Sequence, residues 1–139
     1  MRKHHTKSKG DLGVLKAQVT LFEQGYLSLL PQTEHSEFDL VAYKEGIFKR
    51  VQVKYRSVDK KFGTISLHFS SFWSDKNGNH IVPVNKDEID VYCIYCPETD
   101  LCYWLNPKDF GQSVTLRVET SKNNQKAKVH LASDYTMVP

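Results

Sequence analysis

The sequence contains no long hydrophobic segment. None of its apolar runs approaches the roughly 20 residues that a helix needs to span a bilayer, and residues 1–9 lack the apolar core of a signal peptide. We therefore expect a cytoplasmic protein without membrane contact. The length of 139 residues and the hydrophobic content of 40% suit one globular domain, which we place over residues 1–139.

Cysteine is scarce. The three cysteines are Cys93, Cys96 and Cys102. The first two have CxxC spacing, but they lie in a β-rich apolar run, where side chains three residues apart point to opposite faces of a strand. A structural zinc site usually needs four nitrogen or sulfur ligands. The pattern argues against zinc and predicts reduced, structural thiols.

Acidic residues are missing from the first ten positions. This segment holds Arg2, Lys3, Lys7 and Lys9, and the other fifteen basic residues nearly balance the sixteen acids, for a net charge of +3. A basic arm suits a polyanion such as DNA, because each neutralised phosphate releases condensed counterions. A solvated tail is the alternative interpretation of the same run.

Two segments with strand-like alternation, residues 37–43 and 47–54, flank the turn Glu45-Gly46. Gly46 supplies the positive φ that a two-residue hairpin loop demands. The hairpin register places Asp39 opposite Gln52 and Leu40 opposite Val51. It predicts an apolar face of Phe38, Leu40, Val51 and Val53, and a polar face of Glu37, Asp39, Gln52 and Lys54.

The polar face carries a set of groups with a chemical use. Opposed residues have Cβ atoms roughly 5 Å apart, so Asp39 and Gln52 could share a Mg²⁺ ion, which prefers oxygen ligands. Lys54, two residues along, could orient an attacking water or stabilise developing charge. A solvated polar face without chemistry is the alternative.

Asp39, twelve intervening residues and then Gln52-Val53-Lys54 resemble the signature of the PD-(D/E)XK nuclease superfamily, in the variant with Gln for the second acid. Residues 9–13 resemble the helix that supplies a further acid there. The amino-acid sequence of these and further segments is most similar to the small homing endonucleases encoded in bacterial group I introns. The similarity rests on residues 38–41, 51–55, 72–73, 75–80 and 88–92 and covers nearly the whole chain.

The resemblance implies an α/β fold with a restriction-endonuclease-like core, in which an N-terminal helix packs on a mixed central β-sheet with additional strands. It also implies a divalent metal, Mg²⁺ or in its place Mn²⁺, held by Asp11, Asp39, Gln52 and the carbonyl group of Val53. Asp11, Asp39, Gln52 and Lys54 would be the catalytic residues. The sequence departs from the pattern at Phe38, where proline is common, and at Gln52, whose neutral amide binds Mg²⁺ less strongly than a carboxylate. Asp11 also has a purely structural interpretation, since an acid in a first helical turn favours the helix dipole.

The remaining sequence predicts one helix and several strands. Leu12, Leu15, Val19 and Phe22 recur at intervals of three and four residues, which predicts an amphipathic helix over residues 10–25 that ends at Gly25. Strands are predicted at residues 26–30, 64–69, 90–96, 101–105 and 114–119.

Further candidate DNA contacts lie in polar segments. Residues 76–80 carry a strong turn signal, and turn chemistry alone explains Asn77-Gly78. Residues 121–126 are rich in amides and lysines, and a solvated loop is the alternative there. Arg56 continues the polar face of the hairpin and could touch a phosphate. The candidates outside the basic arm are Arg56, Lys76, Asn77, Asn79, His80, Lys122, Asn124 and Lys126.

These observations favour a metal-dependent, site-specific endonuclease acting on double-stranded DNA. Because one 16.0 kDa protomer cannot cover two half-sites of a long target, we expect a homo-oligomer, either a dimer or a tetramer. Two alternatives stay open. One is a structure-selective nuclease similar to Holliday-junction resolvases, and the other is a DNA-binding module whose metal centre has decayed.

Overall fold

A computed structural model describes residues 5–83, 85–119 and 129–139, with the side chains of all of them except residues 71–73 and 83. Its elements, in chain order, are α1 (His5–Glu23), β1 (Leu27–Leu29), β2 (Leu40–Lys44), β3 (Ile47–Tyr55), β4 (Thr64–His68), β5 (Ser70–Asp75), β6 (Gly78–Pro83), β7 (Val91–Cys96), β8 (Leu101–Leu105), η1 (Pro107–Asp109), β9 (Ser113–Arg117), β10 (His130–Leu131) and η2 (Ala132–Tyr135).

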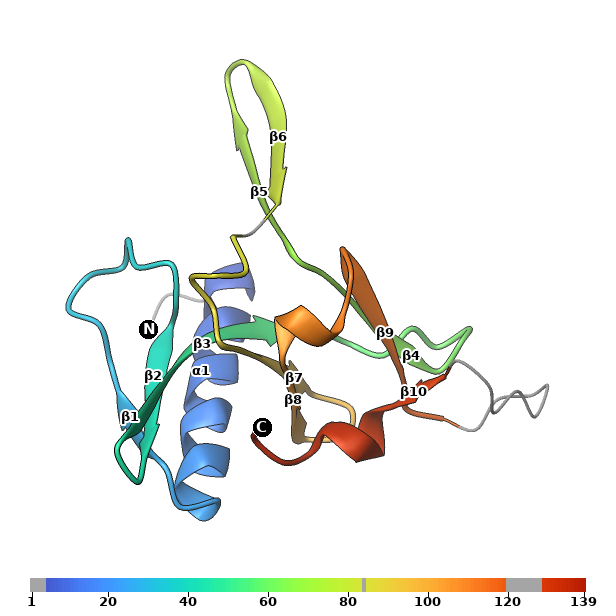
Figure 1. Cartoon of the computed structure of the whole chain (residues 1–139). Coiled ribbons are helices and arrows are strands. Elements are labelled where there is room, and N and C mark those ends of the chain that lie inside the picture. Colours follow the sequence, from blue (N-terminus) through green and yellow to red (C-terminus); the bar gives the residue numbers. More distant parts are fainter. Residues whose placement is uncertain (1–4, 84, 120–128) are drawn as a thin grey trace.

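A mixed five-stranded sheet forms the centre of the molecule (Figure 1), with the strand order β1-β2-β3-β7-β8. Its pairs are antiparallel except for β3 with β7, which run parallel. A second sheet has the order β10-β9-β4, and β5 and β6 form a separate two-stranded sheet. The predicted strands at residues 64–69, 90–96, 101–105 and 114–119 are confirmed to within two residues at each end.

The predicted hairpin of β2 and β3 is confirmed over the paired strands. Leu40 pairs with Val51 and Lys44 with Ile47, in the predicted register. The two loop residues, Glu45 and Gly46, have φ values of 51° and 81°, as the two-residue turns that match strand twist require.

The hairpin ladder ends at Leu40 and Val51, so the predicted pairs of Asp39 with Gln52 and Phe38 with Val53 do not form. The backbone N–H of Asp39 donates to the carbonyl of Val51 at 2.9 Å, the same residue that Leu40 faces. Two residues of one strand thus oppose one residue of the other, as in a β-bulge. The prediction that Phe38 shares the face of Leu40 is wrong, because the bulge breaks the alternation and Phe38 packs on the opposite side of the sheet.

Helix α1 starts five residues earlier than predicted and ends where Gly25 predicts. Gly25 has a φ of 87°. Its N–H donates to Phe22 and that of Tyr26 donates to Leu21, the bonds of a Schellman motif that closes a helix at a left-handed residue. Lys7 and Lys9 therefore lie on the helix rather than in an arm that precedes it.

Helix α1 does not bury the apolar stripe from which it was predicted; a different set of residues faces the sheet. Gly13, Ala17 and Leu21 are buried against the sheet. The stripe of Leu12, Leu15, Val19 and Phe22 is 39–76% exposed. Small residues at the contact let the helix approach the sheet closely, since a Cβ atom at Gly13 would lie 3.3 Å from Cγ1 of Val53.

The central sheet separates two hydrophobic clusters. Between the sheet and α1 lie Ala17, Leu21, Leu40, Val51, Val53, Cys93 and Trp104, among others. On the opposite face, the sheet packs against β4 and β9 through residues that include Ile65, Leu67, Tyr92, Ile94, Cys96 and Leu116. Cys93 and Cys96 belong to different clusters, and the three cysteines are buried and free, as predicted.

The β5–β6 hairpin projects from the body of the molecule (Figure 1). Its strands pair from Ser70 with Pro83 to Asp75 with Gly78. The sequence predicted the turn at its tip but not these two strands. No helix within the described ranges is long and apolar enough to cross a membrane.

Candidate active site at the edge of strand β3

Strand β3 presents its predicted polar residues on the face away from α1. In the parallel ladder, Gln52 pairs with Tyr92 and Lys54 with Ile94, and both partners belong to the cluster opposite the helix. Val51 and Val53 are buried on the helix side. Gln52 and Lys54 are half-buried, and Gln52 forms no side-chain hydrogen bond with any described residue. Its amide is thus free to bind a ligand.

The Asp39 carboxylate lies at the edge of β3. Its Oδ2 atom accepts a hydrogen bond of 2.7 Å from the backbone N–H of Val53, just beyond the point where β2 and β3 stop pairing. Burial raises the pKa of the Asp39 carboxyl group above its usual value, although the Val53 N–H and the charge of Lys54 act in the opposite direction. A half-buried carboxylate fixed by one oxygen keeps its other oxygen for a cation.

The Val53 carbonyl group faces the same side as Asp39. In a β-strand the N–H and C=O groups of one residue point to the same neighbouring strand, and the Val53 N–H points to Asp39. Because the β2 ladder ends at Val51, no strand among the described residues pairs with the Val53 carbonyl on this side. The edge therefore offers a second oxygen ligand next to the Asp39 carboxylate.

Lys54 lies in an environment that disfavours its charged form. Burial lowers the pKa of Lys54, the positive charge of Arg56 lowers it further, and the Asp39 carboxylate opposes both effects. Arg56 is itself fixed by a bond of 2.8 Å from Nη1 to the carbonyl of Tyr55, and burial lowers its pKa as well. A lysine whose proton is held less firmly is suited to exchange protons with water or phosphate.

Asp11 lies on α1, two residues before Gly13, and is exposed. The close approach of Gly13 to Val53 and Tyr55 brings this turn of the helix beside the part of β3 that Asp39 contacts. Lys9 lies over the Tyr55 ring at 5.7 Å. Asp11 forms no hydrogen bond or ion pair with another described residue, and at about 100° per residue it lies well away from the helix face that Gly13 presents to β3.

The oxygen donors at this edge suit a hard divalent cation. They comprise the Asp39 carboxylate, the Val53 carbonyl and the Gln52 amide, with the Asp11 carboxylate on the adjacent helix. Mg²⁺ takes oxygen ligands and retains several waters. Among the described residues, no three or more His, Cys, Asp and Glu side chains lie close enough together to hold a metal ion by themselves.

Comparison with known proteins identifies the family of this chain. A family model described as PD-(D/E)XK endonuclease matches residues 4–138. The chain belongs to the PD-(D/E)XK endonuclease family. Among solved structures it is similar to the bacterial homing endonuclease I-Ssp6803I, with 26% identity and a TM-score of 0.78 over 95% of this chain and 88% of that chain. No curated protein matches the sequence.

Membership of the PD-(D/E)XK family confirms the resemblance and the predicted restriction-endonuclease-like fold. It makes the chain a member of a nuclease family, whose reaction is hydrolysis of phosphodiester bonds. The motif residues Gln52 and Lys54 lie on β3, and Asp39 directly precedes β2.

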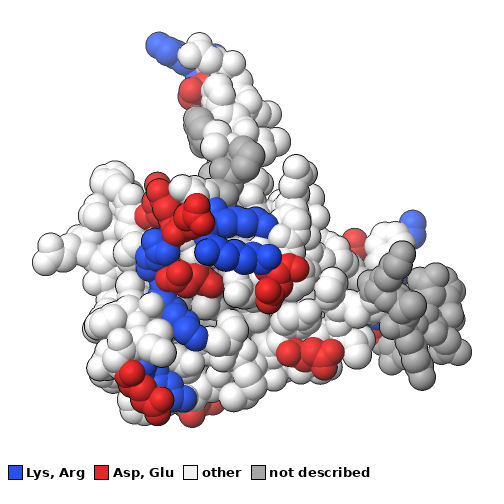
Figure 2. All heavy atoms as spheres, in the orientation of Figure 1, with Lys and Arg blue, Asp and Glu red and all other residues white. Residues whose placement is uncertain are grey.

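Four candidate DNA contacts of this PD-(D/E)XK chain lie at the tip of the projecting hairpin. Lys76, Asn77 and Asn79 are exposed, and Figure 2 shows a basic side chain at the far end of the projecting hairpin. Asp75 organises the turn, because its Oδ1 accepts from the Asn77 N–H at 2.7 Å and lies 3.1 Å from Nε2 of His80. Asn79 accepts a bond of 2.6 Å from the Ser74 hydroxyl, which leaves its NH₂ group to donate. Arg2, Lys3, Lys122, Asn124 and Lys126 lie outside the described residues.

The sequence did not single out an ion pair that joins the middle of β3 to the residue just before β7. Asp90 accepts bonds from Nε and Nη2 of Arg50 at 3.0 and 3.1 Å, and from the Arg50 N–H at 2.7 Å. The pair lowers the pKa of the Asp90 carboxyl group. It fixes Arg50 on the same face as Gln52 and Lys54, and only the pairing of β3 with β7 reveals it, since the two residues are 40 positions apart.

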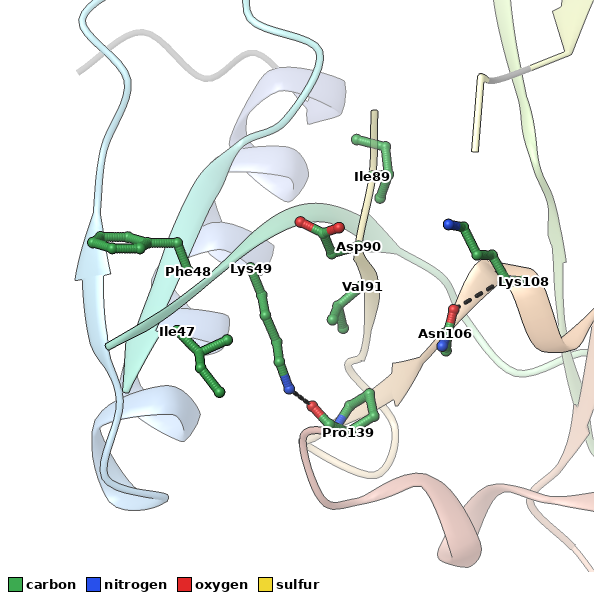
Figure 3. A pocket seen from close by; sticks show the side chains of 9 residues that line it. All are labelled: Ile47, Phe48, Lys49, Ile89, Asp90, Val91, Asn106, Lys108 and Pro139. Atoms are coloured by element: carbon green, nitrogen blue, oxygen red, sulfur yellow. Dashed lines mark hydrogen bonds between the residues drawn. The ribbon is translucent and has the colours of Figure 1, made fainter. Parts of the chain in front are cut away.

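A pocket of about 340 Å³ lies beside this pair (Figure 3). Its lining includes Lys49, Asp90, Asn106 and Lys108. Lys49 donates to the carbonyl of Pro139, and Lys108 lies 3.8 Å from Asp87. Figure 2 shows acidic and basic side chains close together on this face. The charged side chains that line the pocket are Lys49, Asp90 and Lys108, and its lining contains none of the motif residues.

Proposed function

We propose that this protein is a divalent-metal-dependent, site-specific DNA endonuclease, and that it acts as a homing endonuclease. The observation that carries the proposal is the Asp39 carboxylate bonded to the Val53 N–H, at an open strand edge next to a half-buried lysine of lowered pKa. The similarity to a bacterial homing endonuclease supports the homing role. Residues 1–139 would act as one nuclease domain.

In the proposed mechanism, Asp39, Gln52 and the Val53 carbonyl hold Mg²⁺, with Asp11 contributing from α1; Mn²⁺ could take its place. When bound, the ion supplies Lewis acidity at a phosphoryl oxygen and lowers the pKa of a water. The Val53 N–H fixes the Asp39 carboxylate against rotation. Tyr92 is the neighbour of Gln52 on β7. Its phenol stays protonated, because burial raises the pKa of Tyr92 to about 12.

Lys54 would act on the water and on the phosphate. Its ammonium group orients the attacking water and donates to the phosphoryl oxygen on which charge develops. The same burial that lowers its pKa strengthens each of these interactions, because the local dielectric is lower than that of bulk water. Arg56, on the same face, would contact a neighbouring phosphate.

Replacement of Lys54 by Ala tests this mechanism. We expect the cleavage rate of duplex DNA at saturating Mg²⁺ to fall by roughly 100-fold to 1,000-fold, the usual effect of removing one donor to a developing oxyanion, while DNA affinity persists. The readouts are single-turnover cleavage and a DNA-binding titration. Equal cleavage by the variant would remove Lys54 from the mechanism.

The matched control is Lys76→Ala on the projecting hairpin. This exposed lysine would contact phosphate, so we expect weaker binding at every sequence and a salt dependence of affinity reduced by about one ion. The rate at saturating DNA should not change.

Cleavage of linear duplexes compared with a four-way junction separates a site-specific enzyme from a junction resolvase. Metal binding that does not require Asp39 would favour a decayed centre.

A long target also requires more than one protomer. A 16.0 kDa chain covers one half-site at most, and half-sites related by symmetry are read by symmetric oligomers. We propose a dimer or tetramer. A mass of one protomer by light scattering after size exclusion, both with and without DNA, would contradict this.

A further inference from the structure

Both ends of the β5–β6 hairpin are attached to the same loop of the body. On one side, the backbone N–H of Phe69, the residue before β5, donates to the carbonyl of Gln112 at 2.9 Å. On the other side, the ammonium group of Lys86, which follows β6, donates to three backbone carbonyls. These carbonyls belong, at 2.9, 2.6 and 2.6 Å, to Pro107, Phe110 and Gly111. We call residues 107–112, which join β8 to β9, the anchor loop.

Lys86 also joins the two ends of the hairpin to each other. An ammonium group has three N–H donors, and the three carbonyls of the anchor loop accept from them. The Nζ atom lies 5.0 Å from the centroid of the Phe69 ring, which is a cation–π distance. Holding a long lysine side chain in one conformation costs entropy, and these four contacts offset that cost. Lys86 therefore fixes the base of the hairpin.

The base decides where the tip of the hairpin lies. Among the described strands, β5 and β6 pair only with each other, so no ladder joins them to either larger sheet (Figure 1). The six residues of β5 span about 20 Å at about 3.3 Å per residue. A rotation of about 10° at the base would thus move the tip by about 3.5 Å, which is close to the spacing of about 3.4 Å between successive nucleotides of a DNA strand.

The same base is connected to the strand that carries the motif residues. Phe69 is 4% exposed and makes an edge-to-face contact with Tyr92, with the ring centroids 5.0 Å apart. Tyr92 pairs with Gln52 in the ladder of β3 and β7. One packed ring contact and one strand pair therefore connect the base of the hairpin to the candidate metal ligand Gln52.

We propose that Lys86 is a positioning residue, which fixes the direction of the β5–β6 hairpin relative to β3 and thereby the bond at which DNA is cut. The inference rests on the proposed function, in which the hairpin tip contacts DNA and the edge of β3 hydrolyses it. The number of base pairs between the two contacts then depends on the angle of the hairpin. A lysine that only stabilised the anchor loop would affect melting but not the place of the cut.

Lys86→Met tests the proposal on DNA. Methionine keeps an apolar side chain against the Phe69 ring but removes the charge and the three donors. Products from a site that the wild-type chain cuts are mapped to single nucleotides at saturating DNA. Relative to the wild-type bond, cleavage at neighbouring bonds should increase by about tenfold or more, because a misplacement of about 1 Å can cost a factor of about 100 at the correct bond. Lys86→Gln, which keeps an amide donor, is the milder variant and should give a smaller change of the same kind.

The matched control is Lys44→Met at the end of β2. Lys44 is also half-buried, donates to the carbonyl of Gln24 at 3.0 Å and lies 4.8 Å from the centroid of the Tyr26 ring. Its partners lie between α1 and β1 rather than in the anchor loop, so its loss should lower the melting temperature without moving the cut. Displacement of the cut in both variants, or in neither, would overturn the proposal.

A distance measurement on the full chain without DNA tests the geometry independently of cleavage. Nitroxide labels are attached at Lys76→Cys on the hairpin tip and at Glu23→Cys in the last turn of α1, which are exposed positions, whereas the three native cysteines are buried. Dilution with unlabelled chain restricts the signal to distances within one protomer. Electron–electron double resonance should give a narrow distribution that Lys86→Met broadens and Lys44→Met does not. An equally narrow distribution in Lys86→Met would overturn the proposal.

The two measurements separate this inference from the proposed function. A wild-type chain that cuts no DNA would contradict the proposed function, and the distance distribution would still decide whether Lys86 fixes the hairpin. A wild-type chain that cuts at one bond, together with an unchanged cut in Lys86→Met, would contradict this inference alone.

Discussion

Strand β3 and the β5–β6 hairpin carry the candidate functional residues in opposite physical settings. Lys54 on β3, and Asp39 bonded to the Val53 N–H of the same strand, lie in a packed sheet with a hydrophobic cluster on each side. On the hairpin, Lys76, Asn77 and Asn79 lie at an exposed tip that projects from the body (Figure 1). Burial shifts the pKa values of Asp39 and Lys54.

The difference suggests a division of labour. Hydrolysis needs groups held within a fraction of an ångström, which a packed sheet provides. Groove recognition needs reach, and a two-stranded ribbon is narrow enough to enter the major groove of DNA. An isolated hairpin is only marginally stable in water, so this one would gain order from the partner it contacts. Variants matched across the two regions can sharpen or break this comparison.

The largest effect is expected from Asp39→Asn. The amide oxygen can still accept the Val53 N–H, but the negative charge is lost, so metal-dependent cleavage should fall by about 100-fold to 1,000-fold. Because burial raises the pKa of Asp39, its ionised form destabilises the fold, an effect that appears as the pH rises through its unfolded and folded pKa values. The variant should therefore melt at a higher temperature than the wild type at pH 7.

Asp75→Asn is the control for this change. Asp75 is an exposed hairpin carboxylate that also accepts a backbone N–H, from Asn77, so the same substitution is made in the other setting. We expect its cleavage rate at saturating DNA to match the wild type. A similar loss of rate in both variants would mean that charge in general, and not the β3 edge, limits catalysis.

The next effect concerns the helix that supports β3. In Gly13→Val, the new side chain would meet Val53, which lies 3.3 Å from the Cβ position. We expect a loss of about 1–3 kcal/mol in the free energy of unfolding, as for other overpacked contacts, together with slower cleavage. Urea denaturation measures the first and single-turnover kinetics the second.

Gly10→Ala is the control within the same helix. A Cβ atom there meets nothing within 4 Å, so the higher helix propensity of alanine should stabilise the protein by about 1 kcal/mol. If Gly13→Val were as stable as Gly10→Ala, the close contact between α1 and β3 would not exist.

The smallest effect is expected from Asn79→Ala. The substitution removes an amide that is held by the Ser74 hydroxyl and is free to donate to a base edge. We expect discrimination at one base pair to fall by about 1–3 kcal/mol, with no change in the rate at saturating DNA. Selection of cleaved sites from a randomised library measures it. Gln32→Ala, an exposed amide in the loop before β2, should leave the preference unchanged, and an equal shift in both variants would exclude groove reading by the hairpin.

Local sequence patterns predicted the β2–β3 hairpin and most of the helix and strand positions, but not β5 and β6. The register from Leu40 with Val51 to Lys44 with Ile47 follows from alternation and from a two-residue turn, both of which act within fifteen residues. Gly25 marked the end of α1 for an equally local reason. The backbone there has a positive φ, and glycine adopts that conformation with little steric strain. The motif residues on β3 were therefore identified from the sequence.

Long-range contacts decided the rest. An apolar stripe indicates that α1 buries one face, but the sequence does not say whether the partner is its own sheet or another molecule, and here the small residues Gly13 and Ala17 pack inward. The bond from the Val53 N–H to Asp39 and the ion pair of Arg50 with Asp90 join residues 14 and 40 positions apart. Periodicity carries no information about such pairs, because burial can be satisfied by any surface that the tertiary structure brings into reach.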